Sequence, residues 1–343
     1  MFIIIIEVII LIKKAIFSTI TFLIAGSMFL SYAFAGEAET VAVVNGKNCS
    51  SVYEINKTAE KGGEINFVDN INFQSIFKTP KQPSVITGNG KTFHCSYIII
   101  EGDVKFENIN FICDNDFFDI GGNKFEIGEN VSFDDNGKDL VYNITGGGNI
   151  VLKSGNFDRI IGTSVDEIPD ENFYLTVDGK DVNIENVACS SQENYTKNIY
   201  VSVKNGTLNE LDTSGASDSA DIEVSGGKVN SIICGNNTKL KFNGYNNNVA
   251  SVISKDGNVL NIIVENGFAQ IDSFEGKAEI QVGENAKLVM GNRTFECGKY
   301  SIGGSEVKST IKIQDLLNNP IFSNLKKSLH RLRNITQNIN LSN

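Results

Sequence analysis

Residues 220–237 read A-D-I-E-V-S-G-G-K-V-N-S-I-I-C-G-N-N. Apolar and polar residues alternate at the start, two glycines follow, and a second apolar stretch ends in another turn of glycine and asparagine. Alternation predicts a short strand with one buried face, and glycine beside asparagine predicts a tight turn. This stretch therefore predicts two short strands joined by a turn.

The same unit recurs at residues 149–162, 199–215 and 260–276, with the shared template apolar-x-apolar-x-x-Gly-x-apolar-x-x-apolar-x-x-Gly. Turn glycines at equivalent places lie 17 to 27 residues apart; they are Gly155, Gly179, Gly206, Gly227, Gly244 and Gly267. An irregular period of about twenty residues predicts a solenoid, in which turns with loops of different length stack and share one core. A β-sandwich is the alternative all-β arrangement.

The composition fits a folded β-protein. Apolar residues make up 41% of the chain and charged residues 21%, which is enough apolar material for a core. The net charge is -11. Binding to nucleic acid needs a basic surface that neutralises phosphates, so no nucleic-acid partner is expected.

The N-terminal 35 residues have the pattern of an export signal. Lys13 and Lys14 precede an apolar stretch at 15–30, and Ala33-Phe34-Ala35 forms a small-x-small cleavage site. We therefore expect an extracytoplasmic protein, secreted or at the cell surface. The alternative is an uncleaved anchor, because an apolar stretch of about 20 residues can span a bilayer. Contact with a membrane is expected only through this segment.

The mature chain divides into an N-terminal cap at 36–63, a solenoid at 64–310 and a tail at 311–343. In the cap, Ser50-Ser51 with Glu54 three residues on predicts the start of a short helix that ends at Gly62-Gly63. In the tail, apolar residues spaced three and four apart predict an amphipathic helix with a basic side. That helix packs on the acidic body, docks a partner or an anionic surface, or is replaced by a disordered tail.

Three stretches of the chain, in order, carry a family resemblance. They read E-K-G-G-E-I-N-F at 60–67, S-V-I-T-G-N-G-K-T-F at 84–93 and I-I-I-E-G-D-V-K-F-E-N-I-N-F at 98–111. They resemble the opening of right-handed parallel β-helix proteins of the pectate-lyase-like superfamily. The later G-G-K-V-N-S-I units resemble bacterial adhesin-like β-helix repeats. The resemblance, over residues 60–308, implies a right-handed parallel β-helix, whereas strand and turn patterns say little about activity.

Acidic residues in two neighbouring stretches are the candidates for chemistry. They are Asp114, Asp116, Asp134 and Asp135. Asp116 and Asp135 lie about one solenoid turn apart, so stacking would bring their carboxylates close together. Such a pair suits glycoside hydrolysis. Asp114, Asp116 and Asp135 would alternatively suit Ca²⁺, the one cofactor considered, and ordinary solvated turns are the third interpretation.

The resemblance adds one candidate and also argues against catalysis. Pectate lyases use an arginine base, and Arg159 is the arginine of the turns that follow the acidic stretches. Polygalacturonases of the superfamily carry Gly-His-Gly and Arg-x-Lys motifs, which this chain lacks. Its two histidines are His94 and His330, and no motif of a nucleophilic triad, zinc protease, P-loop or dinucleotide site is present.

Six cysteines occur without a close C-x-x-C pair, which argues against a zinc site. Cys95 and Cys113 are 18 residues apart and would stack on adjacent turns. They would either form a disulfide or pack as small apolar side chains.

The sequence thus predicts an exported, non-catalytic, adhesin-like solenoid without a required cofactor, whose partner is a glycan or a cell-surface protein. The alternative is a polysaccharide lyase or glycoside hydrolase that uses Asp116, Asp134, Asp135 and Arg159.

Overall fold

The computed structural model describes residues 39–113, 117–134, 143–163, 172–189, 196–255, 257–303 and 306–309. Strands make up 70% of it and helix 3%, which confirms the predicted all-β class. The export segment, the tail helix and Asp114, Asp116 and Asp135 lie outside the described residues.

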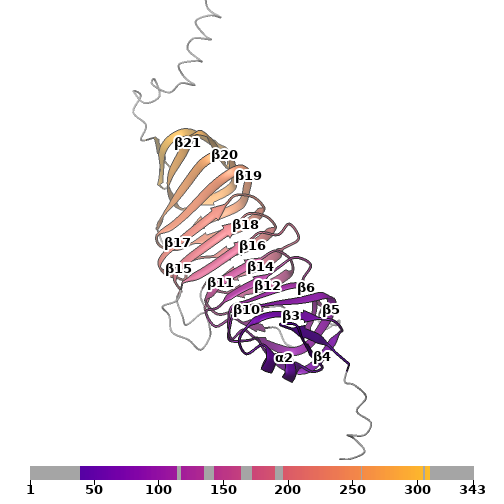
Figure 1. The fold of residues 1–343 in the computed structure, drawn as a ribbon. Helices are drawn as coiled ribbons and strands as arrows, with labels where there is room; N and C mark the ends of the chain where they lie inside the picture. The colour runs from indigo at the N-terminus through magenta and orange to yellow at the C-terminus, as the bar shows by residue number, and fades with distance from the viewer. Residues whose placement is uncertain are drawn as a thin grey trace, which may run out of the picture.

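The elements follow one another as a series of short strands along an elongated molecule (Figure 1). In chain order they are β1 (Ala42–Val44), β2 (Lys47–Cys49), α2 (Val52–Thr58), β3 (Gly63–Phe67), β4 (Ile71–Lys78), β5 (Ser84–Ile99), β6 (Val104–Cys113), β7 (Phe117–Asp119), β8 (Lys124–Ile127), β9 (Ser132–Asp134), β10 (Asn143–Thr145), β11 (Gly148–Leu152), β12 (Asn156–Ile161), β13 (Phe173–Val177), β14 (Asn183–Ala188), β15 (Thr196–Val203), β16 (Thr207–Asp212), β17 (Ala216–Val224), β18 (Lys228–Cys234), β19 (Thr238–Ser254), β20 (Val259–Glu275), β21 (Lys277–Met290), β22 (Arg293–Gly303) and β23 (Glu306–Ser309).

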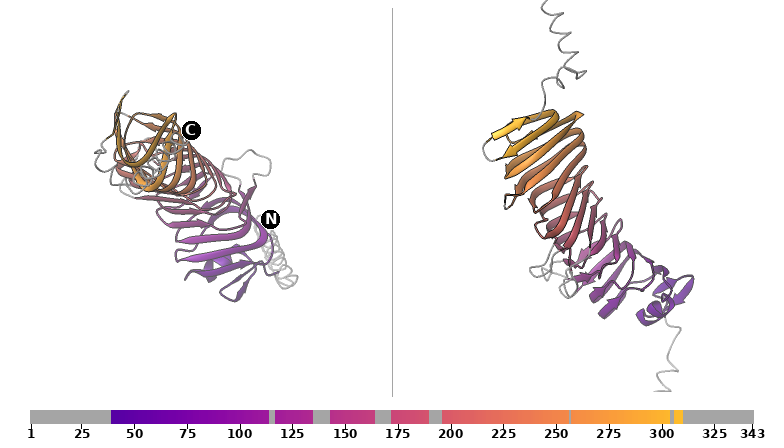
Figure 2. Two further views of the ribbon diagram at one scale, coloured as in Figure 1. Left: turned by 90° about the horizontal axis from the view of Figure 1, so that it is seen from above. Right: turned by 90° about the vertical axis from the view of Figure 1, so that its left-hand side faces the viewer.

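The strands stack in parallel from one turn to the next, so the fold is a parallel β-solenoid (Figure 2). One column of buried register partners runs through Leu175, Val201, Ile222, Leu240, Ile262 and Ile280. Each turn alone leaves its inward residues exposed, and stacking covers them with the residues of its neighbours. The solenoid prediction is confirmed and the sandwich alternative is wrong.

We call the sheet made by β8, β11, β13, β15, β17 and the first halves of β19, β20 and β21 face one. The rest of each turn bends around a corner. In β16, Leu208 and Leu211 are both fully buried although they are three residues apart, which plain alternation does not allow. The apolar-x-x-apolar half of the template therefore marks the place where the strand bends.

The template glycines stack on one another at the turn after face one. Gly206 has φ +81°, and a Cβ added there would lie 2.7 Å from the carbonyl oxygen of Gly179 and 2.8 Å from that of Val182. A Cβ on Gly227 would lie 2.8 Å from the Gly206 oxygen. Glycine is thus required both by the left-handed backbone and by the close approach of the neighbouring turn.

Phenylalanine rings fill the N-terminal half of the core. The rings follow the stack, with centroids 5.5 Å apart for Phe67 and Phe93, 6.2 Å for Phe93 and Phe111, and 5.6 Å for Phe111 and Phe133. Phe133 then contacts Phe157 at 5.4 Å. Edge-to-face and stacked contacts of this kind add to the stabilisation that burial itself gives.

Antiparallel strands cover both ends of the solenoid. At the N-terminal end β1 pairs antiparallel with β2 and β3, and at the C-terminal end β21, β22 and β23 pair antiparallel. The predicted helix is α2: Ser51 is its N-cap, with its hydroxyl accepting from the Glu54 N–H at 3.3 Å. It ends at Thr58 with Ala59 as C-cap, before the predicted Gly62-Gly63 stop.

Candidate functional site

Face one presents a row of outward side chains that the solenoid holds in register. In β13, Phe173 and Leu175 are buried, so alternation turns Tyr174 toward solvent. In β15, Ile199 and Val201 are buried, so Tyr200 between them also points outward. Both tyrosines therefore lie at the same height on adjacent turns.

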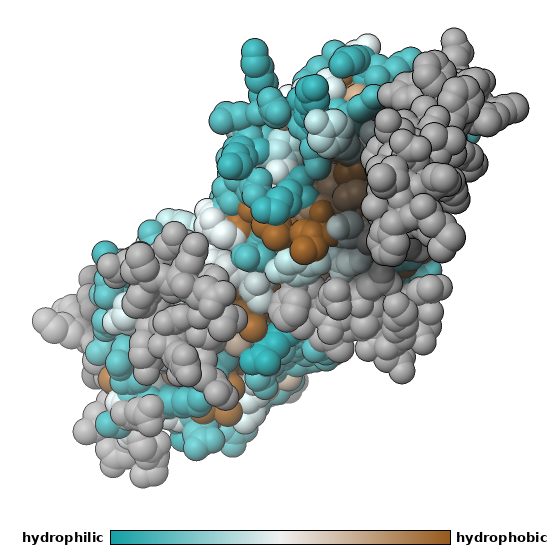
Figure 3. All heavy atoms as spheres, turned by 90° about the horizontal axis from the view of Figure 1, so that it is seen from below, coloured by the Kyte–Doolittle hydropathy of each residue, from teal (hydrophilic) through white to brown (hydrophobic). Residues whose placement is uncertain are grey.

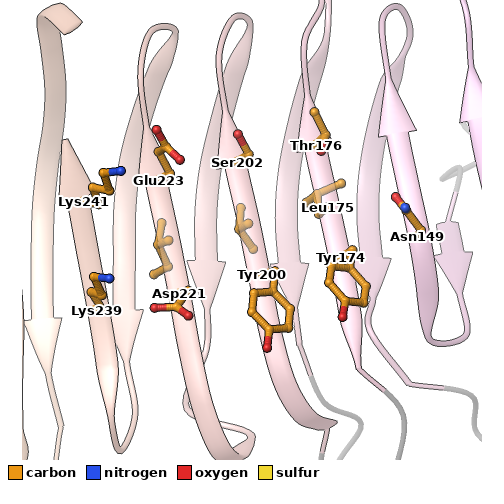
Figure 4. A pocket seen from close by; sticks show the side chains of 12 residues that line it. Asn149, Tyr174, Leu175, Thr176, Tyr200, Ser202, Asp221, Glu223, Lys239 and Lys241 are labelled. Atoms are coloured by element: carbon orange, nitrogen blue, oxygen red, sulfur yellow. The ribbon is translucent and has the colours of Figure 1, made fainter. Parts of the chain in front are cut away.

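The two tyrosines form a parallel stacked pair. Tyr174 and Tyr200 are register partners, with ring centroids 4.7 Å apart and ring planes 7° apart. Figure 4 shows the rings side by side with their hydroxyl groups pointing the same way along the strands. Tyr174 is 39% exposed. The pair is a rigid aromatic surface with polar tips that reaches the solvent.

The row continues beyond the tyrosines with charged residues. Tyr200 is the register partner of Asp221, and Asp221 is that of Lys239. On the other side of the tyrosines, Asn149 of β11 is the register partner of Tyr174 and begins the row. A second outward row lies two residues further along each strand and consists of Thr176, Ser202, Glu223 and Lys241.

These two rows line a shallow open groove of about 370 Å³. A second groove of about 420 Å³ lies further along the same face, lined among others by Asn261, Glu279 and Tyr300. Lys239 lines both grooves, so they adjoin along the solenoid axis. In the view from below, the coloured residues are mostly hydrophilic, and hydrophobic ones gather near the middle of the view (Figure 3). The grooves together suit an extended ligand better than a compact one.

Glu126, on face one outside the groove, is a carboxylate that neighbouring lysines neutralise. On β8, two strands before Tyr174, Oε1 of Glu126 lies 2.9 Å from the Nζ of Lys153 and 3.6 Å from that of Lys105. Burial alone would raise the pKa of Glu126, but the hydrogen bond from Lys153 and the charges of Lys153, Lys105 and Lys124 outweigh it and lower that pKa. This carboxylate is therefore held ionised by its neighbours.

In the second groove, the Tyr300 hydroxyl donates a 2.6 Å hydrogen bond to the Glu296 carbonyl oxygen. Partial burial raises the pKa of Tyr300, which keeps its phenol protonated. The tyrosine thus lines this groove as a neutral side chain with a fixed ring position.

Of the predicted catalytic residues, the structure describes Asp134 and Arg159, which lie outside the grooves. Asp134 ends β9 and Arg159 lies in β12; both are exposed, and neither lines either groove of face one. Their strands are in neighbouring turns, since Phe133 contacts Phe157. Asp114, Asp116 and Asp135 lie outside the described residues, so their pairing stays a prediction.

The described residues hold no group of three or more His, Cys, Asp or Glu side chains placed to bind a metal ion. Cys95 and Cys113 are register partners on β5 and β6, as the stacking argument predicted. Both are buried thiols with their sulfur atoms 3.6 Å apart. The disulfide itself stays a prediction.

Sequence reasoning missed the tyrosine pair. The signal is present in F-Y-L-T-V at 173–177 and I-Y-V-S-V at 199–203, where tyrosine takes the same place in two copies of the strand template. The two copies are separated by one turn with a long loop. Only the register of the solenoid shows that they are adjacent.

No protein-family model, curated protein or solved structure matches the chain. The resemblance to the pectate-lyase-like superfamily and to adhesin repeats therefore stays a prediction beyond the solenoid fold itself. Among the described residues, no helix has the length and apolar character needed to cross a bilayer.

Proposed function

We propose that this protein is an exported, non-catalytic, adhesin-like solenoid that binds a glycan along face one. The observation that carries the proposal is the stacked pair of Tyr174 and Tyr200 in an open groove, with hydrogen-bonding and charged side chains in line with it. Export is supported by the signal-like segment at 1–35.

The chemistry of the groove matches that of a sugar chain. A sugar ring has apolar C–H faces, which pack on aromatic rings, and hydroxyl groups at its edge, which need donors and acceptors. The tyrosine pair supplies the apolar surface, and Asn149, Thr176 and Ser202 supply neutral polar partners beside it. Adjacent turns repeat at about 4.8 Å, close to the length of one sugar in an extended chain.

A glycan fits this surface better than a folded protein partner does. Stable protein interfaces have a large apolar centre that is closely packed on both sides. On face one, the exposed large apolar side chains are few; Tyr174 is among them, and its neighbours in the rows are polar or charged. A narrow aromatic strip with polar and charged side chains beside it suits a single extended chain.

The test is a sizing column with light scattering, in which purified protein is mixed with neutral and acidic polysaccharides with and without Ca²⁺. We expect protein to co-elute with at least one polymer whose mass stays constant. Tyr174→Ala should weaken binding about tenfold, since removing an aromatic anchor typically costs 1 to 2 kcal/mol. Tyr53→Ala is the matched control, because Tyr53 is 73% exposed on α2 at the far end.

Two results would overturn the proposal. A falling polymer mass would establish an enzyme, and loss of that activity in Asp134→Ala or Asp135→Ala would support the alternative. Equal binding by the Tyr174→Ala and Tyr53→Ala variants would show that face one is not the site.

A further inference from the structure

We propose that the groove on face one selects glycans that contain N-acetylated amino sugars, and that it holds the acetamido group between Asp221 and Lys239. This inference rests on the proposed function, because the tyrosine pair has to bind a sugar chain for the group to be presented.

Asp221 and Lys239 are adjacent opposite charges in the row that contains the tyrosines. They are register partners on β17 and β19, both are exposed, and both line the groove beside Tyr200 (Figure 4). Among the described residues, neither side chain has a hydrogen bond or an ion pair, and the two are not paired with each other. They are available to a ligand.

The second row on the same two strands behaves differently. Glu223 accepts a hydrogen bond from Nδ2 of Asn243 at 3.3 Å, and Nζ of Lys241 lies 3.1 Å from Glu265. The charges of this row are already satisfied by neighbours. The difference singles out the row that contains the tyrosines as the one that meets the ligand.

Hydrogen-bond chemistry then defines the group that fits. An ionised carboxylate only accepts hydrogen bonds and an ammonium group only donates them. A ligand that pairs with both residues therefore needs a hydrogen-bond donor at Asp221 and an acceptor at Lys239, one strand away. An acetamido group is a planar trans amide whose N–H and C=O point to opposite sides, so it supplies both at once.

The order of residues in the row also matches the group. In a trans acetamide the methyl group lies on the same side as the N–H. With the N–H on Asp221 and the C=O on Lys239, the methyl group faces Tyr200, which is next to Asp221 in the row. Tyr200 then covers an apolar methyl group, and no polar atom of the amide is left without a partner.

Other sugars satisfy only part of this arrangement. Hydroxyl groups both donate and accept, so a neutral glucan binds without being preferred. A free amino sugar suits Asp221 but places a positive charge beside Lys239. A sugar carboxylate suits Lys239 but is repelled by Asp221.

The experiment compares three linear hexasaccharides by titration calorimetry with the purified protein. Chitohexaose carries the acetamido group, cellohexaose a hydroxyl and fully deacetylated chitohexaose an amino group at the same carbon. We expect chitohexaose to bind about tenfold or more tightly than either of the others, because hydrogen bonds to charged groups contribute roughly 1.5 to 3 kcal/mol.

Variants then assign the preference to its residues. In Asp221→Ala and in Lys239→Met, the preference for chitohexaose over cellohexaose should fall to about twofold or less. Lys228→Met is the matched control, because Lys228 is exposed on β18 outside the grooves of face one and its loss should leave the preference intact. An unchanged melting temperature shows that each variant is folded.

The failures can be told apart. Equal affinity for chitohexaose and cellohexaose overturns this inference and leaves glycan binding in place. Equal or tighter binding of the deacetylated sugar overturns it too, because charge would then drive binding. If no glycan of any class binds, the proposed function fails and the inference fails with it.

Discussion

Gly46 and Gly206 have the same backbone angle but different surroundings. Both have φ +81°, yet a Cβ on Gly46 would meet nothing within 4 Å, whereas one on Gly206 would lie 2.7 Å from the Gly179 oxygen. Gly46→Ala should cost about 1 to 2 kcal/mol through backbone strain alone. Gly206→Ala should cost a further 1 to 3 kcal/mol, because the neighbouring turn has to move. Chemical denaturation of both variants measures the loss of unfolding free energy. Equal losses in the two variants would show that the neighbouring turn moves without cost.

Five of the six cysteines are buried and Cys297 is half-buried. In the native protein we expect iodoacetamide to modify Cys297 and no other cysteine. Unfolding without reductant should then expose the remaining five thiols, or three if Cys95 and Cys113 are joined. Peptide mass mapping gives both answers, and native labelling of Cys189 or Cys234 would contradict the described core.

The buried thiols also make stability depend on pH. Burial, with a smaller contribution from the Asp212 charge, raises the pKa of Cys189 and raises that of Cys234 to about 12, from an ordinary value of 9.0. The unfolded chain therefore loses these protons before the folded one does. Stability is fully present below pH 9 and should fall above it by about 1.4 kcal/mol per pH unit for each thiol. Denaturation at pH 8, 9 and 10 measures the slope, which Cys234→Ala should reduce.

At the scale of the strand, the bend within β16 explains why two buried leucines are three residues apart, which simple alternation does not explain. Leu211 is fully buried on the far side of the bend in β16, whereas its neighbour Glu210 faces outward and accepts a hydrogen bond from Asn186 at 2.8 Å. Leu211→Ala should cost about 2 to 5 kcal/mol. Glu210→Ala should change stability by about 0.5 kcal/mol or less. The reverse order in denaturation experiments would place the bend elsewhere.

The strand and turn elements were predictable because their signals are local. Alternation and glycine spacing within residues 220–237 correctly predict β17, the turn and β18. The groove was not predictable in the same way. Tyr174 and Tyr200 meet only because two strands pair in register, and register depends on loop lengths that vary from turn to turn.

For the acidic candidates, the sequence signal is a spacing between turn residues. Asp134 is a catalytic candidate in the sequence because carboxylates near one another suit catalysis. In the structure it is an exposed residue at the end of β9. Asp and Asn are common at the turns of any solenoid, so their presence there has little meaning without the geometry around them. Spacing correctly predicted that Cys95 and Cys113 stack, but a spacing carries no information on whether a groove encloses a residue.

At the scale of the whole molecule, the two ends of the solenoid are the places where its strand edges meet the surroundings. Every turn pairs with the next through backbone hydrogen bonds, so an uncovered terminal strand is a template for another chain. Here β1 pairs with the edge of β3 at one end, with α2 packed on β1 and β2, and β22 with β23 covers β21 at the other end.

Removing residues 39–62 should therefore cause self-association. The deletion takes away β1, β2 and α2 and leaves the free edge of β3 next to β4, whose Ile76 is already 51% exposed. We expect light scattering to show assemblies whose mass rises with protein concentration, while the intact chain keeps a constant mass. Ser51→Ala is the control, since it loosens the start of α2 by about 1 kcal/mol without exposing the strand edge. If the shortened protein stays monomeric at every concentration, the cap does not protect the edge, and its role is confined to covering the apolar core beneath α2.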